Sequence, residues 1–190
     1  LEGKPVIIAG DPNKRGVVST CSYEARKYGI YSSMPTKTAL RLCPNGVFVK
    51  PRIEYYKAVS DVIFDIYKEY SDLVEPLSLD EAFLDVTENH YGMESTKEIV
   101  TQIKGKIRQQ VNLTASAGNS FNKFFAKLAL DMQKPNGLTE INEDNFEAII
   151  DEMDIKKFFG IGKVSLEMFH KLGIYKGKDL KRVPEEKMYE

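Results

Sequence analysis

Cysteine, histidine and tryptophan are scarce in this chain of 190 residues, which has two cysteines, two histidines and no tryptophan. Cys21 and Cys43 show no paired metal-ligand spacing. They are expected to be free, buried thiols in a reducing compartment. The chain has no run of about 18 apolar residues, so we expect no membrane segment, and Leu1–Pro5 shows no signal-peptide pattern. These scarcities predict a globular cytoplasmic protein without a membrane partner.

Net charge is also nearly absent, at −1, and by itself this argues against a nucleic-acid partner. The distribution of charge argues the other way. Residues 1–57 carry ten Lys/Arg against four Asp/Glu, residues 58–100 two against eleven, residues 101–140 six against two, and residues 141–190 nine against eleven. Basic blocks around an acidic block suit a protein that binds a polyanion near an acidic site for metal cations. A solvated surface of mixed sign gives the same totals.

The hydrophobic periodicity predicts an α+β fold, with helices packed on one face of a largely antiparallel sheet. Strands are expected at residues 5–9, 17–22, 47–49, 73–77, 79–86 and 113–117. Helices are expected at residues 23–28, 35–42, 54–70 and 94–111, and from Asn119 or Ser120 to about Met132. After Thr139 the periodicity is purely helical.

The segment Ser78–Asp85 reads SLDEAFLD and places two adjacent carboxylates at the start of an apolar strand. Successive side chains on a strand face opposite ways, so Asp80 and Glu81 can converge on one ion only where the chain bends out of a turn. Hard oxygen ligands without nearby Cys or His favour Mg²⁺ or Mn²⁺. A pair of surface acids at a hairpin is the alternative interpretation.

Two clusters favour the binding of phosphate groups. Tyr23 and Arg26 lie three residues apart on a predicted helix, and a phenol beside a guanidinium suits a phosphate. Lys123 and Lys127 lie one helical turn apart, and Lys134 precedes a Pro-Asn-Gly turn, which together would make a cationic rim. An ordinary amphipathic helix and solvated lysines are the alternatives.

A third cluster, Phe158–Lys163, reads FFGIGK between two predicted helices. Helix, Gly-Ile-Gly, helix is the helix-hairpin-helix pattern, in which glycines and helix-start amides receive a DNA phosphate without reading sequence. We expect Ile155–Gly173 to form it, with Gly160, Ile161, Gly162 and Lys163 at the DNA. Phe158, Phe159, Val164, Leu166 and Phe169 are expected to hold the two helices together. A plain helical turn is the alternative.

Four motifs in order resemble the Y-family (translesion) DNA polymerases, nearest the DinB branch. They read YEARKYGI, SLDEAFLDV, NKFFAKLA and KPNG, and the helix-hairpin-helix follows them. The resemblance implies fingers at 1–51, palm at 52–141 and thumb at 142–190. It implies that the chain begins after the family's first palm strand, which carries a further metal-binding Asp, and ends inside the thumb, before the DNA-gripping domain. Activity of the chain alone is therefore expected to be weak or absent.

The resemblance also implies the chemistry, which is two-metal transfer of a nucleotide from a dNTP to a primer 3′-OH. Two Mg²⁺ ions, or Mn²⁺, would be held at Asp80 and Glu81. The expected triphosphate contacts are Thr20, Tyr23, Arg26 and Lys134. Val17 and Ser19 would cover the nascent base pair, and Ser78 would lie near the primer terminus. Primer-template DNA and dNTP are the expected partners, with a sliding clamp reached through regions outside the chain.

Two other hypotheses remain open from the sequence. One is a non-catalytic DNA-binding module that uses the helix-hairpin-helix and the basic first segment. The other is a different palm-fold enzyme, such as a nucleotide cyclase, although the Tyr23/Arg26 cluster and the Gly-Ile-Gly segment speak against it.

Overall fold

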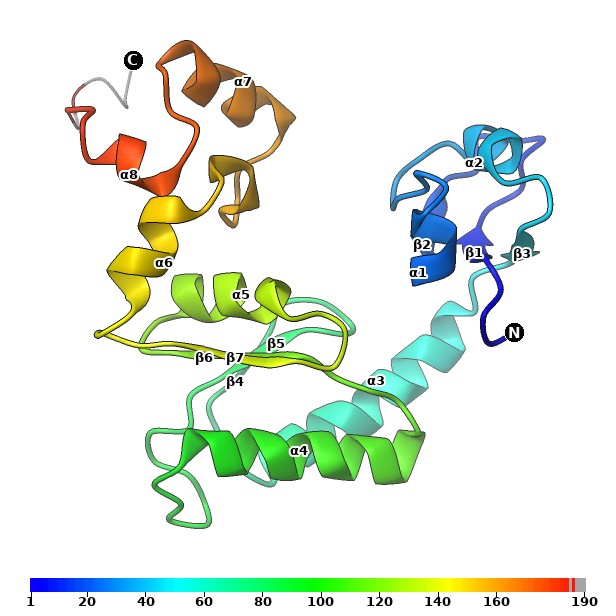
Figure 1. Ribbon diagram of the computed structural model, residues 1–190. Helices are drawn as coiled ribbons and strands as arrows, with labels where there is room; N and C mark the ends of the chain where they lie inside the picture. Colours follow the sequence, from blue (N-terminus) through cyan, green and yellow to red (C-terminus); the bar gives the residue numbers. More distant parts are fainter. Residues whose placement is uncertain (185, 187–190) are drawn as a thin grey trace. The chain divides into compact units, whose positions relative to one another are not determined.

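The computed structural model describes residues 1–184 and 186, and its contacts divide the chain into two compact units, Leu1–Ala58 and Val59–Glu190. The end of the expected thumb, residues 185 and 187–190, lies outside the described residues. The described residues form sixteen helices and strands, and Figure 1 shows their order along the chain. No helix among the described residues is long and apolar enough to cross a membrane.

The first unit is a three-stranded sheet with helices. Its strands are β1 (Val6–Ala9), β2 (Val18–Cys21) and β3 (Val47–Val49), in the order β2-β1-β3. β1 pairs antiparallel with β2 and parallel with β3, so β2 is an edge strand. The helices are α1 (Tyr23–Arg26) and α2 (Thr36–Leu42).

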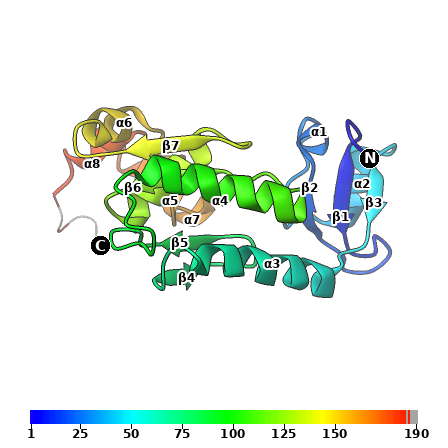
Figure 2. The same cartoon turned by 90° about the horizontal axis from the view of Figure 1, so that it is seen from below.

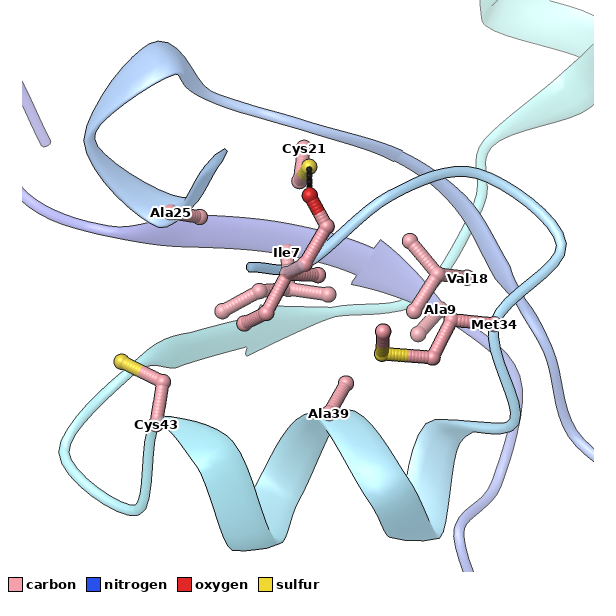
Figure 3. Close-up of a cluster of buried hydrophobic side chains, with 9 residues drawn as sticks. Ile7, Ala9, Val18, Cys21, Ala25, Met34, Ala39 and Cys43 are labelled. Carbon is pink, nitrogen blue, oxygen red and sulfur yellow. Dashed lines mark hydrogen bonds between the residues drawn. The ribbon is translucent and has the colours of Figure 1, made fainter. Parts of the chain in front are cut away.

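A small apolar core fixes this unit. Side chains from the strands, α1 and α2 meet in it, and they include both cysteines (Figure 3). The Cys21 thiol donates a hydrogen bond to the Ile30 carbonyl at 3.4 Å, and Cys21 and Cys43 are both free and buried. The expectation of free, buried thiols is therefore confirmed.

The second unit contains two short sheets. β4 (Val74–Pro76) pairs antiparallel with β5 (Ala82–Leu84), whereas β6 (Ala117–Ser120) pairs parallel with β7 (Leu138–Ile141). The α+β class is confirmed, but this unit has one antiparallel pair and one parallel pair of strands rather than a largely antiparallel sheet. β6 starts four residues later than the expected strand at 113–117. β7 begins just before Thr139, after which only helical periodicity was expected. Both strands are short, and their polar or glycine residues hide the alternation.

Helices cover the strands of this unit on two sides rather than on one. Long helix α3 (Ile53–Lys68) enters it from the first unit, and Ile66 of α3 packs with Ile99, Ile103 and Ile107 of α4 (Thr96–Val111). On the other side, α5 (Lys123–Met132) packs on β6 and β7 (Figures 1 and 2). The Asn122 side chain accepts a hydrogen bond from the Phe125 amide at 2.9 Å, so Asn122 caps α5 rather than Asn119 or Ser120.

The chain ends in short helices around a separate core. These are α6 (Phe146–Glu152), the 3₁₀ turn η1 (Ile155–Lys157), α7 (Lys163–Lys171) and α8 (Gly177–Leu180). Ile155, Phe158 and Ile174 are the buried centre of this core. The first arm of the expected helix-hairpin-helix is thus a single 3₁₀ turn rather than a full helix. Lys156 and Lys157 in this arm are exposed, so Ile155 is the one residue of the 3₁₀ turn that is buried in the core.

Candidate functional site

The two adjacent carboxylates lie where the sequence predicts them, on the turn between β4 and β5. The amides of Leu77 and Ser78 both donate to the Glu81 carbonyl, at 2.9 Å and 3.1 Å, and close the turn. Buried Ser60 of α3 donates to the Leu79 carbonyl at 2.5 Å and holds the turn against the helix. The carboxylates therefore project from a well-anchored bend.

Asp80 is the more open of the two acids. Its carboxylate accepts a hydrogen bond from the Ser78 hydroxyl at 2.7 Å, and the residue is exposed. Burial, and then the charge of Asp80, raise the pKa of Tyr67 on α3, which places Asp80 within electrostatic reach of that phenol. Asp80 is therefore open to solvent.

Glu81 is instead engaged by lysines. Its Oε1 lies 2.6 Å from Nζ of Lys127 and 4.0 Å from Nζ of Lys134. The Glu81 side chain is 30% exposed and that of Lys127 only 10%. Glu81 is neither in an apolar core nor paired with an arginine, the two outcomes that would remove it as a ligand. The pairing with Lys127 was not predicted, because 46 residues separate the partners and lysine is usually solvated.

Lys134 is placed by the turn that follows α5. Its Nζ pairs with Asp131 Oδ1 at 2.6 Å. A Cβ at Gly137 would lie 2.0 Å from the Gln133 carbonyl oxygen, so only glycine permits this turn to fold back on the end of α5. The turn thus directs Lys134 toward the Asp80–Glu81 bend, and these three expected site residues come together in one unit.

A cavity of about 650 Å³ opens beside this bend. Residues of both β5 and β6 line it, together with Glu81, Lys127 and apolar side chains of α4. In the described part of the chain, β5 is paired only with β4 and β6 only with β7. Each strand therefore keeps one edge free of a strand partner, and both strands border the cavity.

The donor set fits a hard divalent cation in part. Two carboxylates and no soft ligand favour Mg²⁺ or Mn²⁺. Among residues 1–184 and 186, no group of three His, Cys, Asp or Glu side chains could hold a metal ion. The bend supplies two ligands, so a complete octahedral site needs oxygen atoms from elsewhere.

The first unit carries the other predicted phosphate contacts. Ser22 caps α1, since its hydroxyl accepts from the Ala25 amide at 3.3 Å and donates to the Lys4 carbonyl at 3.2 Å. This orients α1 so that Tyr23 and Arg26 are exposed and adjacent, with the guanidinium carbon 6.0 Å from the ring centroid. Ser22 was not predicted as a site residue, although its place just before the helix is typical of an N-cap.

The remaining expected residues of this unit gather at edge strand β2. Val17, just before the strand, is half exposed, and both Ser19 and Thr20 are exposed. These side chains, with Tyr23 and Arg26, are accessible to a ligand. Arg26 and Lys134 belong to different units, and their convergence on one phosphate stays a prediction.

The Gly-Ile-Gly segment also has the expected accessibility. Gly160 has φ +92°, which favours glycine, and Cβ atoms added at Gly160 or Gly162 would meet no heavy atom within 4 Å. Ile161 packs into the local core, while Lys163 at the start of α7 is exposed. Leu166 and Phe169 also pack there. The expected packing roles of Phe159 and Val164 are wrong, since they are 49% and 73% exposed.

Comparison with known proteins agrees with this geometry. Residues 1–131 match the impB/mucB/samB family. The chain belongs to this family, the Y-family DNA polymerases. It is 54% identical over 182 residues to a DNA polymerase IV of Listeria monocytogenes and 55% identical over 181 residues to one of Clostridioides difficile. These alignments cover 96% and 95% of the chain but 51% and 50% of the relatives.

Solved Y-family structures share the fold. A crystal structure of DinB from Sulfolobus solfataricus superposes with a TM-score of 0.88 at 32% identity, over 98% of this chain and 55% of that one. An insertion ternary complex of Dbh DNA polymerase gives 0.88 at 34% identity, over 98% and 56%. Family membership favours the polymerase hypothesis over the binding module and the cyclase. The chain spans about half the length of the curated relatives it matches.

Proposed function

We propose that this Y-family chain is the catalytic part of a template-directed DNA polymerase of the translesion type. It would transfer a nucleotide from a dNTP to a primer 3′-OH on template DNA, in damage tolerance and repair. The observation that carries the proposal is the Asp80–Glu81 bend, anchored by Ser60 and directly beside Lys134. Fingers, palm and thumb are proposed at 1–51, 52–141 and 142–190.

In this proposal Asp80 and Glu81 hold divalent cations, Mg²⁺ or Mn²⁺. When bound, such ions activate the primer hydroxyl and stabilise charge on the transferred phosphate. Ser78 keeps the Asp80 carboxylate oriented, because its hydroxyl donates a hydrogen bond to that carboxylate at 2.7 Å. Exposed Ser78 is also proposed to lie near the primer terminus.

The nucleotide is proposed to be bound by its triphosphate. Arg26 offers a planar fork, Tyr23 a directed hydroxyl, Thr20 a second hydroxyl and Lys134 a point charge. Val17 and Ser19 present small side chains toward the nascent base pair. Charge-assisted hydrogen bonds to phosphate are roughly twice as strong as neutral ones. These groups therefore contribute more to nucleotide affinity than the identity of the base does.

The Gly160–Lys163 segment is proposed to receive a phosphate of the DNA duplex, and its exposure supports this. A sliding clamp is proposed as a partner of the longer protein, outside this chain, and the bacterial cytoplasm as its location. The cavity between β5 and β6 also supports the expectation of a further palm strand, because it offers two strand edges and apolar walls.

Primer extension tests the proposal in a form as long as the curated relatives. Loss of a residue that only orients a metal ligand costs about 10–100-fold, so loss of a direct ligand in Asp80→Asn should lower extension by more than ~100-fold. The affinity of Asp80→Asn for duplex DNA should stay within about twofold of the wild type, since most DNA contacts are electrostatic contacts to phosphates away from Asp80. Asp85→Asn is the matched control, as Asp85 follows the same strand and accepts from the Thr87 amide at 3.0 Å. Equal extension by both variants would reject the assignment.

A further inference from the structure

Lys127 is the one charged residue among the buried residues of the described chain. Its neighbours Leu128 and Ala129 belong to the apolar core under α5. Lysine is almost never fully buried unless it is paired, and the partner here is Glu81 at 2.6 Å. A buried ammonium on one of the two candidate metal ligands requires a reason beyond packing.

The backbone holds Lys127 in place. A Cβ at Gly118 of β6 would lie 2.0 Å from the Ala126 carbonyl oxygen, so α5 rests directly on the strand at the residue before Lys127. The far end of the side chain lies 5.8 Å from the ring centroid of Phe159, which adds a cation–π contact. The ammonium is therefore aimed at Glu81 by a rigid helix rather than by a mobile stem.

The position of this ammonium conflicts with a cation on Glu81. A Mg²⁺ or Mn²⁺ ion bound to Oε1 would stand about 2.1 Å from that oxygen, on an atom that already has an ammonium at 2.6 Å. The two cations would stand close together and would repel each other. Lys134 is a weaker competitor, because it lies 4.0 Å away and is paired at 2.6 Å with Asp131.

We infer that Lys127 is a positioning residue that occupies the cation's place on Glu81 until a divalent ion displaces it. The inference rests on the proposed function of Asp80 and Glu81 as metal ligands. In the metal-free protein the ammonium neutralises Glu81 and fixes its carboxylate beside the cavity. Loading of the cation then requires release of the ammonium, which lowers the affinity of the free site for metal.

The test is Mn²⁺ binding by a form of the protein as long as the curated relatives, measured by electron paramagnetic resonance of the free ion. Lys127→Met keeps the apolar stem and removes the charge. It should bind Mn²⁺ at least about tenfold more tightly than the wild type, since tenfold is 1.4 kcal/mol and adjacent charges exceed this. Lys123→Met is the matched control, because Lys123 lies one turn earlier on α5 and pairs with Glu75 instead. It should stay within about twofold of the wild type.

The outcomes separate the inference from the function on which it rests. If Asp80→Asn abolishes Mn²⁺ binding but Lys127→Met binds no more tightly than the wild type, the inference alone fails. An equal gain in Lys123→Met also overturns it, because bulk charge would then explain the effect. If Asp80→Asn binds Mn²⁺ as the wild type does, or if no protein binds it, both the proposed metal site and the inference are wrong.

Thermal unfolding without metal gives an independent readout. Lys127→Met should lower the melting temperature because it removes the closest partner of the partly buried Glu81 carboxylate. Glu81→Gln should lower it because it leaves the buried Lys127 ammonium without its carboxylate partner. The double variant should melt above the value that the two single losses add up to. Additive losses would contradict the inference. Lys127→Gln, which keeps a polar end, replaces the Met variant in both measurements if that variant does not fold.

Discussion

Arg26 and Arg41 are both exposed arginines on short helices of the first unit, but only Arg26 lies beside a tyrosine. If Arg26 contacts the triphosphate, Arg26→Ala in a form as long as the curated relatives should raise the KM for dNTP. A hydrogen bond to a charged group is worth about 1.5–3 kcal/mol, which corresponds to roughly 10–100-fold. Steady-state single-nucleotide insertion measures this. Arg41→Ala is the control and should leave the KM unchanged, whereas equal effects of both changes would count against the role.

Residue chemistry could be predicted wherever it is local. The Asp80–Glu81 pair on a bend and the Tyr23/Arg26 pair on a helix follow from spacing, since a strand alternates and a helix repeats every 3.6 residues. The Lys127–Glu81 pair could not be predicted. It depends on how closely α5 packs on β6, and only the absence of a side chain at Gly118 hints at that distance.

At the scale of the element, the start of α7 provides a prediction about DNA. Gly162 has open space around it, so Gly162→Val should fold but should prevent close approach of a phosphate to the backbone. Duplex affinity should fall about equally for any sequence. Fluorescence anisotropy with two unrelated duplexes, after a melting curve to confirm folding, measures this. Unchanged affinity in a folded variant would show that the glycine serves only the turn.

Two lysines at opposite ends of α7 allow the effect of charge to be distinguished from the effect of position in the same assay. Lys163 begins the helix at the glycine turn, and Lys171 ends it. If only the turn touches phosphate, Lys163→Gln should reduce the slope of log affinity against log salt by about 1. Lys171→Gln removes the same charge and should leave the slope nearly as it is. Equal slopes for the two variants would place the DNA elsewhere on this unit.

Helices α6 and α8 provide a prediction about acid. Hydrogen bonds from Lys176 and Lys178 hold the pKa of Glu152 down, to about 2 from an ordinary 4.5. A carboxyl whose pKa is lower in the folded state stabilises the fold above the ordinary value, and this stabilisation is lost as pH falls from about 4.5 toward 2. Glu152→Gln should lower the melting temperature at pH 7, but only by about 1–3 °C, because exposed ion pairs are weak. Below pH 4.5 the melting temperature of this variant should fall less steeply with pH than that of the wild type.

Melting curves from pH 7 to pH 2.5 in low salt measure this prediction. Glu167→Gln, on the exposed side of α7, is the matched control and should behave as the wild type. Added salt should reduce the difference between Glu152→Gln and the wild type, since exposed pairs are screened. A difference that persists unchanged at pH 2.5 would contradict the ion-pair explanation.

Elements were predictable in proportion to their length. α3 and α4 follow from repeated apolar spacing, and the structure places both within two residues of their expected ends. β6 and β7 were misplaced or missed. Four-residue strands such as AGNS and LTEI show no clear alternation, and parallel pairing between them comes from α5 as the crossover.

At the scale of the whole molecule, the pairing of strands was beyond the sequence, because it joins segments far apart in the chain. The structure leaves one edge each of β5 and β6 at a cavity of about 650 Å³ with apolar walls from α4. Unpaired edges with apolar neighbours are a liability for folding and association. A strand placed between them would satisfy both edges and cover the half-buried side chains of Ala82 and Leu84 on β5.

A form of the chain that carries the family's first palm strand should therefore be more stable than the 190-residue chain. In a protein of 150–250 residues, 1 kcal/mol shifts the melting temperature by about 2–4 °C. Two ladders of backbone hydrogen bonds and added apolar burial should give an increase of about 5 °C or more in calorimetry. An extension of the same length made of Gly and Ser is the control and should give none. Equal melting temperatures for the two extended forms would mean that the cavity does not receive a strand, and that the second unit is already complete.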